Sequence, residues 1–337
     1  MKAILDKLFG KETLTNQEAF DVLCSIGNGV MNAAQLASFM TVYRMREISL
    51  QELKGFREAL VALAKRIELP KENAIDLCGT GGDGRNSFNI STLASFVVAG
   101  AGGKVIKHGN YGVSSISGSS TVLEKLGYNF TSDSSDLERS LDECGICFLH
   151  APLFHPALKY VSGVRKELGV HTFFNMLGPL VNPAQPKHRL TGVYSLELLR
   201  KYHYLLQESN EVFTLINSED GYDEISLTSP CRIVTPDKEF VFEPSDYGFV
   251  TYSEDDLFGG NSAAEASRIF TNVLKGKGTQ AQIDVVAINA GSALLNLGVV
   301  LDLESGIGLA KEVLVSGKAL NSFQHFISLG ANRNISV

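Results

Sequence analysis

From about residue 74 onward, short apolar segments alternate with helical segments and glycine-rich turns, and this alternation restricts the fold more than any other feature of the chain. A strand followed by a helix is the repeating unit of a parallel sheet. We therefore predict an α/β domain over residues 74–337, with a mostly parallel central sheet flanked by helices. The predicted strands are 74–78, 104–107, 146–149, 190–194, 212–216 and 225–227, with a small hairpin inside 230–244.

The first 70 residues have the pattern of a small all-α domain. Thr15 with Glu18, and Ser49 with Glu52, match the capping box that begins a helix. Apolar residues then recur every three or four positions, as on the buried face of a helix. We predict an N-terminal helical bundle over residues 1–70, joined by part of 160–190, and a linker at 69–73.

Composition excludes several classes of protein. The 337 residues include 30 Lys and Arg against 37 Asp and Glu, so the net charge is 30 − 37 = −7, which offers no positive field to a nucleic acid. Five cysteines and the lack of an apolar leader segment indicate a reducing, cytoplasmic setting. Residues 285–301 are the most apolar stretch but fall short of the ~20 residues that span a bilayer. We predict a buried core helix there and no membrane association.

Glycine is concentrated in one part of the chain. Residues 79–118 contain 10 of the 32 glycines, and Gly79-Thr-Gly-Gly-Asp-Gly84 follows the first predicted strand. Glycines let backbone N–H groups converge on an anion. Asn89-Ile-Ser-Thr92 then places Ser91 or Thr92 at a helix N-terminus, which also favours anions. A tight turn and a simple helix cap explain the same residues, so both interpretations stay open.

Two further segments carry candidate chemistry. Residues 107–120 follow the second predicted strand and contain Lys107 and five serines. Adjacent parallel strands end at one crevice, so we expect both loops at one ligand site, with a solvated Ser/Gly loop as the alternative. The pair Asp223-Glu224 offers the carboxylate oxygens that Mg²⁺ takes together with substrate phosphates, although by itself this pair is typical of a turn. Arg165 is either a surface charge or a clamp for a carboxylate.

Taken together, these segments resemble the anthranilate phosphoribosyltransferase family in order and spacing. The resemblance covers essentially the whole chain. The matching motifs are Gly79-Thr-Gly-Gly-Asp83, Asn89-Ile-Ser-Thr92, Lys107-His-Gly-Asn110, Ser114-Ser115, Val164-Arg-Lys-Glu-Leu-Gly169, Asn175-Met-Leu-Gly-Pro-Leu-Val-Asn-Pro183 and Asp223-Glu224.

The resemblance implies a homodimer formed through the helical domain, and the third step of tryptophan biosynthesis. In that reaction phosphoribose moves from 5-phosphoribosyl 1-diphosphate (PRPP) to the amine of anthranilate. The catalytic positions match Lys107, Asp223 and Glu224, and Ser91, Asp223 and Glu224 match positions for two Mg²⁺ ions. Matching anthranilate contacts are Gly79, Asn110 and Arg165, with His108 and His155 lining that side of the pocket. The implied PRPP contacts are Gly79, Gly82, Asp83, Ser87, Asn89, Ile90, Ser91, Thr92, Lys107, His108, Gly109, Asn110, Tyr111, Gly112, Val113, Ser114, Ser115 and Ser119.

The chain departs from the common family pattern at a few positions. Tyr111 stands where arginine is frequent, Ser120-Thr121 where Ala-Asp is frequent, Gly163 where proline is usual and His171 where arginine is usual. These changes concern the anthranilate entrance, because all proposed metal and phosphate positions are kept. Two alternatives remain: a pyrimidine nucleoside phosphorylase, which shares Lys-His-Gly-Asn and Ser-Ser, and a non-catalytic nucleic-acid-binding relative. The net charge of −7 and the intact acidic pair disfavour the second.

Overall fold

The computed structural model describes residues 1–112 and 117–331, and the chain divides into two compact units. The helical unit consists of residues 1–67 and 151–183, and the α/β unit consists of residues 68–150 and 184–337. All strands in the described part of the chain belong to the second unit. The predicted fold class, a helical bundle together with a mostly parallel α/β domain, is confirmed.

The helical unit begins with four helices whose starts are encoded locally. The helices of this unit are α1 (Lys2–Phe9), α2 (Asn16–Gly27), α3 (Ala33–Met45), α4 (Leu50–Leu63), α8 (Ala151–Phe154) and α9 (Lys159–Leu168). The predicted capping boxes at Thr15 and Ser49 are confirmed, and Asn32 forms a third one before α3. In each box a side-chain oxygen accepts an N–H group that the first turn leaves unpaired.

Aromatic rings hold the two chain segments of this unit together. Phe39, Tyr43 and Phe56 come from α3 and α4, and Phe173 comes from the second segment. Their ring centroids lie 4.7–6.0 Å apart, mostly in edge-to-face or tilted arrangements, which aromatic pairs prefer. The second segment therefore supplies part of the same hydrophobic core.

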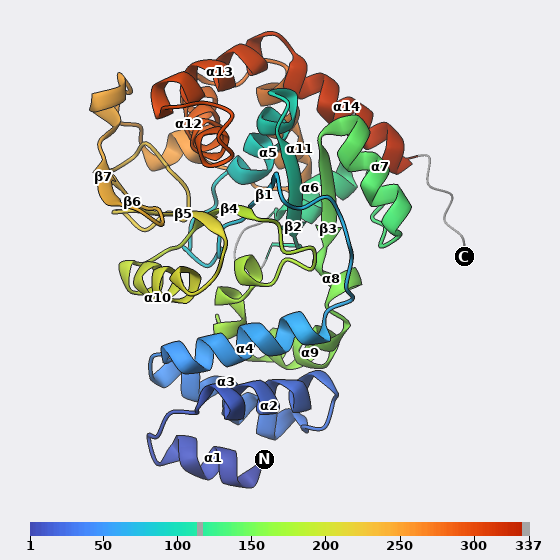
Figure 1. Cartoon of the computed structure of the whole chain (residues 1–337), viewed down its shortest axis with the longest axis vertical. Coiled ribbons are helices and arrows are strands. Elements are labelled where there is room, and N and C mark those ends of the chain that lie inside the picture. Colours follow the sequence, from blue (N-terminus) through green and yellow to red (C-terminus); the bar gives the residue numbers. More distant parts are fainter. Residues whose placement is uncertain (113–116, 332–337) are drawn as a thin grey trace. The chain divides into compact units, whose positions relative to one another are not determined.

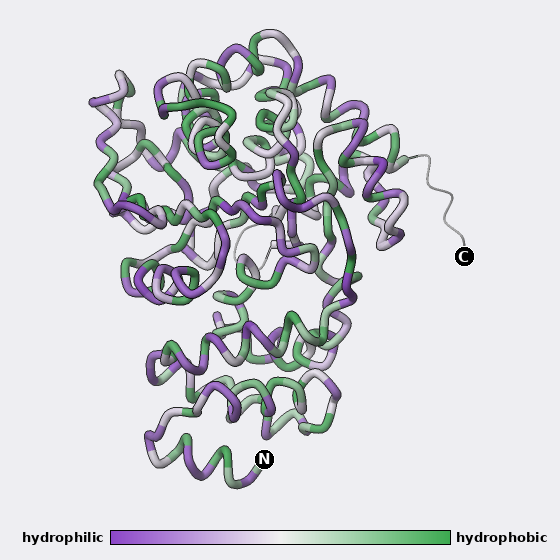
Figure 2. Tube along the Cα trace, viewed as in Figure 1, coloured by the Kyte–Doolittle hydropathy of each residue, from purple (hydrophilic) through white to green (hydrophobic). Residues whose placement is uncertain are grey.

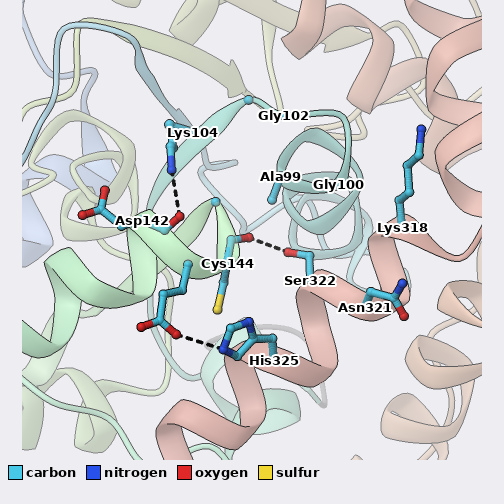
Figure 3. Close-up of a pocket in the computed structure, with 13 residues that line it drawn as sticks. Ala99, Gly100, Gly102, Lys104, Asp142, Cys144, Lys318, Asn321, Ser322 and His325 are labelled. Atoms are coloured by element: carbon cyan, nitrogen blue, oxygen red, sulfur yellow. Dashed lines mark hydrogen bonds and ion pairs between the residues drawn. The ribbon is translucent and has the colours of Figure 1, made fainter.

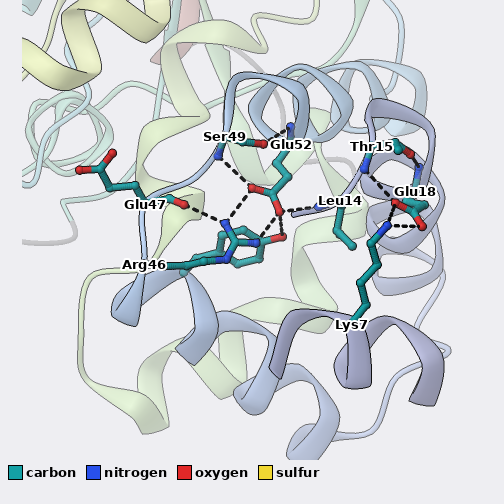
Figure 4. A network of polar contacts seen from close by, with 9 residues as sticks. Lys7, Leu14, Thr15, Glu18, Arg46, Glu47, Ser49 and Glu52 are labelled. Carbon is teal, nitrogen blue, oxygen red and sulfur yellow. Dashed lines mark hydrogen bonds and ion pairs between the residues drawn. The ribbon is translucent and has the colours of Figure 1, made fainter. Parts of the chain in front are cut away.

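A buried carboxylate lies beside this core (Figure 4). Glu52 is fully buried, and it accepts hydrogen bonds from the Leu14 N–H at 3.0 Å and the Ser49 N–H at 2.8 Å. The Tyr43 hydroxyl donates at 3.1 Å, and Arg46 donates through both terminal nitrogens at 2.5 and 2.9 Å. One carboxylate thus joins the segment before α2 to α3 and α4.

The α/β unit is built on one seven-stranded sheet with the order β3-β2-β1-β4-β5-β6-β7. The first five strands are parallel, and β6 and β7 form an antiparallel hairpin at the edge. The strands are β1 (Ala74–Leu77), β2 (Lys104–Gly109), β3 (Ile146–His150), β4 (His188–Gly192), β5 (Val212–Ser218), β6 (Cys231–Val234) and β7 (Glu239–Phe242). Strand β1 lies between β2 and β4, so the loop after β1 is flanked by the ends of both neighbours.

Helices cover both faces of this sheet. Figure 1 shows α12, α13 and α14 on one side and α10 on the other. The helices of this unit are α5 (Ile90–Gly100), α6 (Ser119–Lys125), α7 (Ser134–Cys144), α10 (Leu196–Gln207), α11 (Ala263–Leu274), α12 (Gln280–Asn296), α13 (Leu303–Val315) and α14 (Lys318–Ala331). Helices α5 and α12 are the most buried, and α12 is largely hydrophobic in Figure 2. They form the centre of the main core.

Two predicted elements differ from the structure. The segment 225–227 is not a strand, although Ile225 and Leu227 are fully buried. The core helix predicted over 285–301 ends at Asn296, because Gly298 has a φ of +70° that an α-helix cannot adopt. Leu301 is 95% exposed, so the last part of that apolar stretch lies at the surface.

Candidate active site

The glycine loop leaves β1 at the carboxyl edge of the sheet. Its first residues continue the pairing with β4, because the Cys78 N–H donates to the Leu190 carbonyl at 3.1 Å and the Thr80 N–H to the Gly192 carbonyl at 3.0 Å. Gly81 and Gly82 then adopt φ values of +60° and +78°. Only glycine takes this conformation without strain, so these residue types determine that the backbone turns here.

The acidic pair contacts this loop and the following helix directly. The Gly81 N–H donates to Asp223 Oδ2 at 2.6 Å, and the Ser91 N–H at the start of α5 donates to Glu224 Oε1 at 3.3 Å. A Cβ atom at Gly79 would overlap the Asp223 carboxylate. The predicted proximity of the glycine loop, Ser91 and the acidic pair is therefore present within the α/β unit.

Side chains, not strand pairing, hold the turn that carries Asp223 and Glu224. The Asn289 side chain on α12 accepts the Ile225 N–H at 3.1 Å and donates to the Ile225 carbonyl at 2.9 Å. The Ser218 hydroxyl at the end of β5 donates to the Glu224 carbonyl at 2.7 Å. These bonds satisfy buried backbone groups that a sheet would otherwise pair. Leu227 adopts a φ of +60°, outside the β region, so the predicted strand at 225–227 does not form.

The site carries excess negative charge. Burial, followed by the nearby Asp83 carboxylate, raises the pKa of Asp223. Burial, followed by Asp223, raises the pKa of Glu224, and the Lys107 ammonium opposes this shift. Lys107 is only 2% exposed, and its Nζ donates to the Leu77 carbonyl and lies 3.4 Å from the Ser91 hydroxyl. One buried cation therefore faces three carboxylates, and a bound cation would relieve their repulsion.

The donor set fits a magnesium ion that substrate phosphates complete. Asp223, Glu224 and the Ser91 hydroxyl offer oxygen atoms only, as Mg²⁺ prefers. Among the described residues, no cluster of three His, Cys, Asp or Glu side chains is arranged to hold a metal alone. Mg²⁺ commonly binds through one or two carboxylates, waters and substrate phosphates, so two carboxylates and a hydroxyl suffice.

The second predicted loop begins at the end of β2, beside the first. Asp76 on β1 accepts the His108 N–H at 3.1 Å, and the Asn110 carbonyl accepts the Ser120 N–H at 3.2 Å. The Asn89 amide donates to the Ser117 carbonyl at 2.9 Å, which links the two loops. Val113, Ser114 and Ser115 lie outside the described residues.

The other predicted PRPP contacts fall into three groups. Ile90 and Thr92 are buried in the first turn of α5, so only their backbone groups are available to a ligand. Asp83 accepts the Arg85 N–H at 3.0 Å, and Tyr111 is 42% exposed. The remaining members lie on the two loops or at the start of α6: Gly82, Ser87, Gly109, Gly112 and Ser119.

The predicted anthranilate contacts belong to both units. Gly79, His108 and Asn110 lie in the α/β unit, and His155 and Arg165 lie in the helical unit. The Arg165 guanidinium donates to Asn175 Oδ1 at 3.1 Å and packs over the Phe174 ring. Burial lowers its pKa, and no carboxylate of the described residues pairs with it. A half-buried cation of this kind is suited to an acidic ligand.

Sequence analysis missed two residues that support the site. Asn289 holds the exit of the acidic turn, and its place within the apolar α12 was a usable signal, since a buried amide needs hydrogen-bond partners. Arg85 connects the glycine loop to the same turn, with bonds to the Asp220 carbonyl at 2.9 Å and to Glu254 at 2.5 Å. A lone arginine in a loop carries no comparable signal.

A separate cavity of about 440 Å³ lies at the opposite edge of the sheet (Figure 3). It is lined by Lys104 at the start of β2, by the end of α7 and by α14. The Lys104 ammonium donates to the Leu141 carbonyl at 2.7 Å, and His325 lies 3.0 Å from Glu143. Its charged groups already have partners, so it is not the candidate site. In the part of the chain that the structure describes, no helix is long and apolar enough to cross a membrane.

Comparisons with known proteins show the family of this chain. Residues 2–64 match the model of the "Glycosyl transferase family, helical bundle domain" and residues 71–320 match the "Glycosyl transferase family, a/b domain". An anthranilate phosphoribosyltransferase of Flavobacterium johnsoniae is 54% identical over 324 residues, 96% of this chain and 98% of that protein. One of Bacteroides thetaiotaomicron is 50% identical over 329 residues, 98% of this chain and 99% of that protein.

Solved structures agree as well. Anthranilate phosphoribosyltransferase from Thermus thermophilus superposes with a TM-score of 0.89 at 32% identity, covering 96% of this chain and 98% of that one. The Saccharomyces cerevisiae enzyme in complex with PRPP and Mg gives a TM-score of 0.90 at 29% identity, covering 98% and 97%. The fold is thus that of a glycosyl transferase with a helical bundle domain and an a/b domain. Within that family, the chain belongs to the anthranilate phosphoribosyltransferases.

Proposed function

We propose that this chain transfers the phosphoribosyl group of PRPP to the amine of anthranilate and releases diphosphate, with the glycine loop, Ser91, Lys107 and the acidic pair as its PRPP site. The observation that carries this assignment is the contact between the glycine loop and Asp223, at the carboxyl edge of a parallel sheet. Open α/β sheets bind their ligands at this edge. The glycine loop suits a phosphate group, and the carboxylate pair in contact with it suits a metal ion. Together they suit a substrate that binds as a complex of phosphate and metal.

The largest demand of this reaction is the charge that leaves with diphosphate. Breaking the bond at C1′ leaves an oxocarbenium-like sugar, so the protein must stabilise the departing anion more than it must activate a nucleophile. The buried Lys107 ammonium places positive charge at this edge of the sheet, where it would help the glycine loop to stabilise the departing anion. Lys107 also lies next to Ser91, so it orients that hydroxyl.

We propose that Ser91, Asp223 and Glu224 hold two Mg²⁺ ions together with the diphosphate. Bound Mg²⁺ supplies neutralisation of the charge that develops on the leaving group. The bonds to Gly81, Ser218 and Asn289 described above hold Asp223, the Glu224 carbonyl and the adjacent Ile225, and the Ser91 N–H donates to the Glu224 carboxylate. Each bond fixes a carboxylate or its backbone before substrate arrives, which removes a reorganisation cost from the reaction.

Anthranilate needs orientation more than activation. Its aromatic amine is neutral at pH 7 and needs no deprotonation before it attacks. Holding this amine near C1′ lowers the activation barrier by several kcal/mol. We therefore assign no general base. Gly79 and Asn110 are the proposed contacts from the α/β unit, with His108 and His155 lining the pocket, and Arg165 is the proposed partner of the anthranilate carboxylate.

Replacing Arg165 with Ala is expected to raise the KM for anthranilate at least about tenfold, because a charge-assisted hydrogen bond to a carboxylate contributes about 1.5–3 kcal/mol. The KM for PRPP is expected to stay within about twofold of the wild-type value. Steady-state kinetics with each substrate varied in turn measure both constants. Equal increases in the two KM values would show that Arg165 does not bind the carboxylate.

The proposed function is tested by the loss of anthranilate fluorescence in the presence of PRPP and Mg²⁺. Consumption that requires all three components supports the proposal. The competing pyrimidine nucleoside phosphorylase would instead release a free base from uridine or thymidine with inorganic phosphate and would ignore anthranilate. A chain that consumes neither substrate pair but retains DNA or RNA in a binding assay would support the nucleic-acid-binding alternative.

We further propose that the chain is a cytoplasmic homodimer that pairs through its helical unit. Large apolar side chains are exposed on this unit, among them Phe9, Val30 and Met45, the last at 84% exposure. Exposed apolar surface of this kind is typical of an interface between copies. Sedimentation velocity of the full chain, compared with a Met45→Glu variant, distinguishes a dimer from a monomer.

A further inference from the structure

Arg85 connects three segments that are distant in the sequence. It lies two residues after Asp83, in the loop between β1 and α5. One terminal nitrogen donates to Glu254 at 2.5 Å, and the other donates to the Asp220 carbonyl at 2.9 Å. The guanidinium carbon also lies 5.0 Å from the centre of the Tyr222 ring. Both terminal nitrogens thus have protein partners, so Arg85 is placed to hold structure more than to bind substrate.

Two of these contacts are on the turn that carries the acidic pair. Asp220 and Tyr222 come three residues and one residue before Asp223, and Tyr222 is buried. Asn289 and Ser218 fix the turn at Glu224 and Ile225, after the pair. Before the pair, Asp220 is bonded to Ser229 and Thr228, and the Ser218 N–H donates to the Tyr222 carbonyl at 3.2 Å. Arg85 adds the side-chain contacts that link this part of the turn to the glycine loop.

The far side of Arg85 is itself anchored. Glu254 begins a 3₁₀ turn, Glu254–Leu257, that runs into a segment paired with the glycine loop. The Phe88 N–H donates to the Leu257 carbonyl at 3.0 Å, and the Gly259 N–H donates to the Asn86 carbonyl at 2.7 Å. A Cβ at Gly259 would lie 2.6 Å from the Ser87 carbonyl oxygen, so the two backbones are in close contact. The partner of Arg85 on this side, Glu254, is therefore part of a segment that is held against the glycine loop by backbone hydrogen bonds.

We propose that Arg85 is a positioning residue for the metal site, which keeps the turn 220–224 closed against the glycine loop. This inference rests on the proposed function for its kinetic consequence, but not for its structural one. Arginine suits the role because its planar fork donates in two directions while its face covers an aromatic ring. Lysine can keep the ion pair with Glu254 but cannot make all three contacts at once.

The structural consequence is measured without substrate or metal. Hydrogen–deuterium exchange of the full chain is expected to be at least about tenfold faster in peptides covering residues 219–224 when Arg85 is replaced with Met, because a local opening replaces a held turn. Peptides from α12 and β5 are expected to exchange as in the wild type. Unchanged exchange at 219–224 would overturn the proposal, and so would faster exchange throughout the α/β unit.

The kinetic consequence is that the variant needs a higher Mg²⁺ concentration for activity. Loss of a group that orients metal ligands typically reduces metal affinity about 10–100-fold. We expect Arg85→Met to raise the Mg²⁺ concentration for half-maximal activity at least about tenfold. The value for Arg85→Lys should lie between those of Arg85→Met and the wild type. Excess Mg²⁺ should restore the activity of Arg85→Met to within about twofold of the wild type. The KM for anthranilate should not change. Loss of activity that Mg²⁺ does not restore, with a raised KM for anthranilate, would contradict a positioning role.

Arg139→Met is the matched control, since Arg139 is also an arginine paired with a glutamate, Glu143, but on the exposed face of α7. It is expected to behave as the wild type in both measurements. If the wild-type chain does not consume anthranilate, the proposed function fails, whereas the exchange comparison still decides the role of Arg85. The two failures are therefore distinguishable.

Discussion

Replacing Asp223 with Asn together with Glu224 with Gln is expected to reduce kcat/KM for PRPP by at least about a thousandfold, with no comparable change in the KM for anthranilate. Both substitutions keep the size of the side chain but remove its charge. The amide groups also present N–H donors toward Gly81 and Ser91, which themselves donate to the native carboxylates. The site would thus lose both its affinity for a cation and its hydrogen bonds. Initial rates across a range of Mg²⁺ and PRPP concentrations measure the effect.

The chain offers a matched control for this double substitution. Asp142-Glu143 is a second Asp-Glu pair, near the end of α7, and it is distant from the carboxyl edge of the sheet. Asp142→Asn with Glu143→Gln is expected to leave kcat and both KM values within about twofold of the wild type. Because removal of buried repulsive charge also affects folding, thermal melting of each variant should accompany the kinetics. A double Asp223 and Glu224 variant that turns over normally at low Mg²⁺ would exclude the pair from the reaction.

The sequence predicted the two loops of the site because each follows a strand of a parallel sheet. Backbone geometry at Gly81 and Gly82 is local, so the residue types reveal it. The adjacency of β1 and β2 follows from the usual nearness of consecutive βα units. Placement of the acidic turn required knowledge of the strand order, since β4 lies between β1 and β5.

Gly192, at the end of β4, shows why sequence patterns alone did not predict where the acidic turn lies. A Cβ at Gly192 would overlap the Asp223 carbonyl group. The absent side chain is what lets the turn pass over the end of β4 and reach the glycine loop. In the sequence, however, Gly192 lies inside the predicted strand 190–194, where nothing marks it as a point of close contact. Only the fold shows that its hydrogen atom faces the acidic turn.

Ile225 and Leu227 illustrate a different limit. They are buried, and their alternation with Ser226 is the pattern of a strand. A pattern of apolar residues reports burial, but it does not report which partner satisfies the backbone. Here the amide of Asn289 does so, 64 positions away in the sequence. Long-range side-chain partners of this kind override a local preference that is otherwise correct.

The helical unit shows the same division between local and distant causes. The capping boxes at Thr15 and Ser49 were predicted from four-residue patterns, and both exist. In both, a glutamate accepts the N–H of the cap residue, at 2.8 Å in each case. Glu18 is partly exposed, with its side chain 35% accessible, and Lys7 pairs with it, whereas Glu52 is fully buried among donors from three segments (Figure 4). Identical motifs therefore carry very different shares of the stability.

Substitution of Glu52 with Gln is expected to lower the free energy of unfolding by about 3–5 kcal/mol, whereas Glu18→Gln is expected to lower it by about 1 kcal/mol or less. All partners of Glu52 are donors: the Leu14 and Ser49 N–H groups, the Tyr43 hydroxyl and the Arg46 guanidinium. A glutamine would turn an NH₂ group toward some of them and leave the Arg46 charge without its counterion. Urea unfolding of the full chain, followed by exchange in peptides of α2 and α4, measures the difference.

The effect of Glu52 should depend on pH in a defined direction. Burial raises the pKa of Glu52, but the hydrogen bonds from Arg46, Leu14 and Ser49 outweigh burial, and the pKa is lowered below its ordinary value of 4.5. A carboxylate with a lowered pKa stabilises the fold fully above 4.5 and progressively less as the pH falls through the pKa of the folded state. The gap in stability between the wild type and Glu52→Gln is therefore expected to be constant at neutral pH and to shrink under acid. A gap that widened as the pH fell would mean that Glu52 is protonated in the native helical unit.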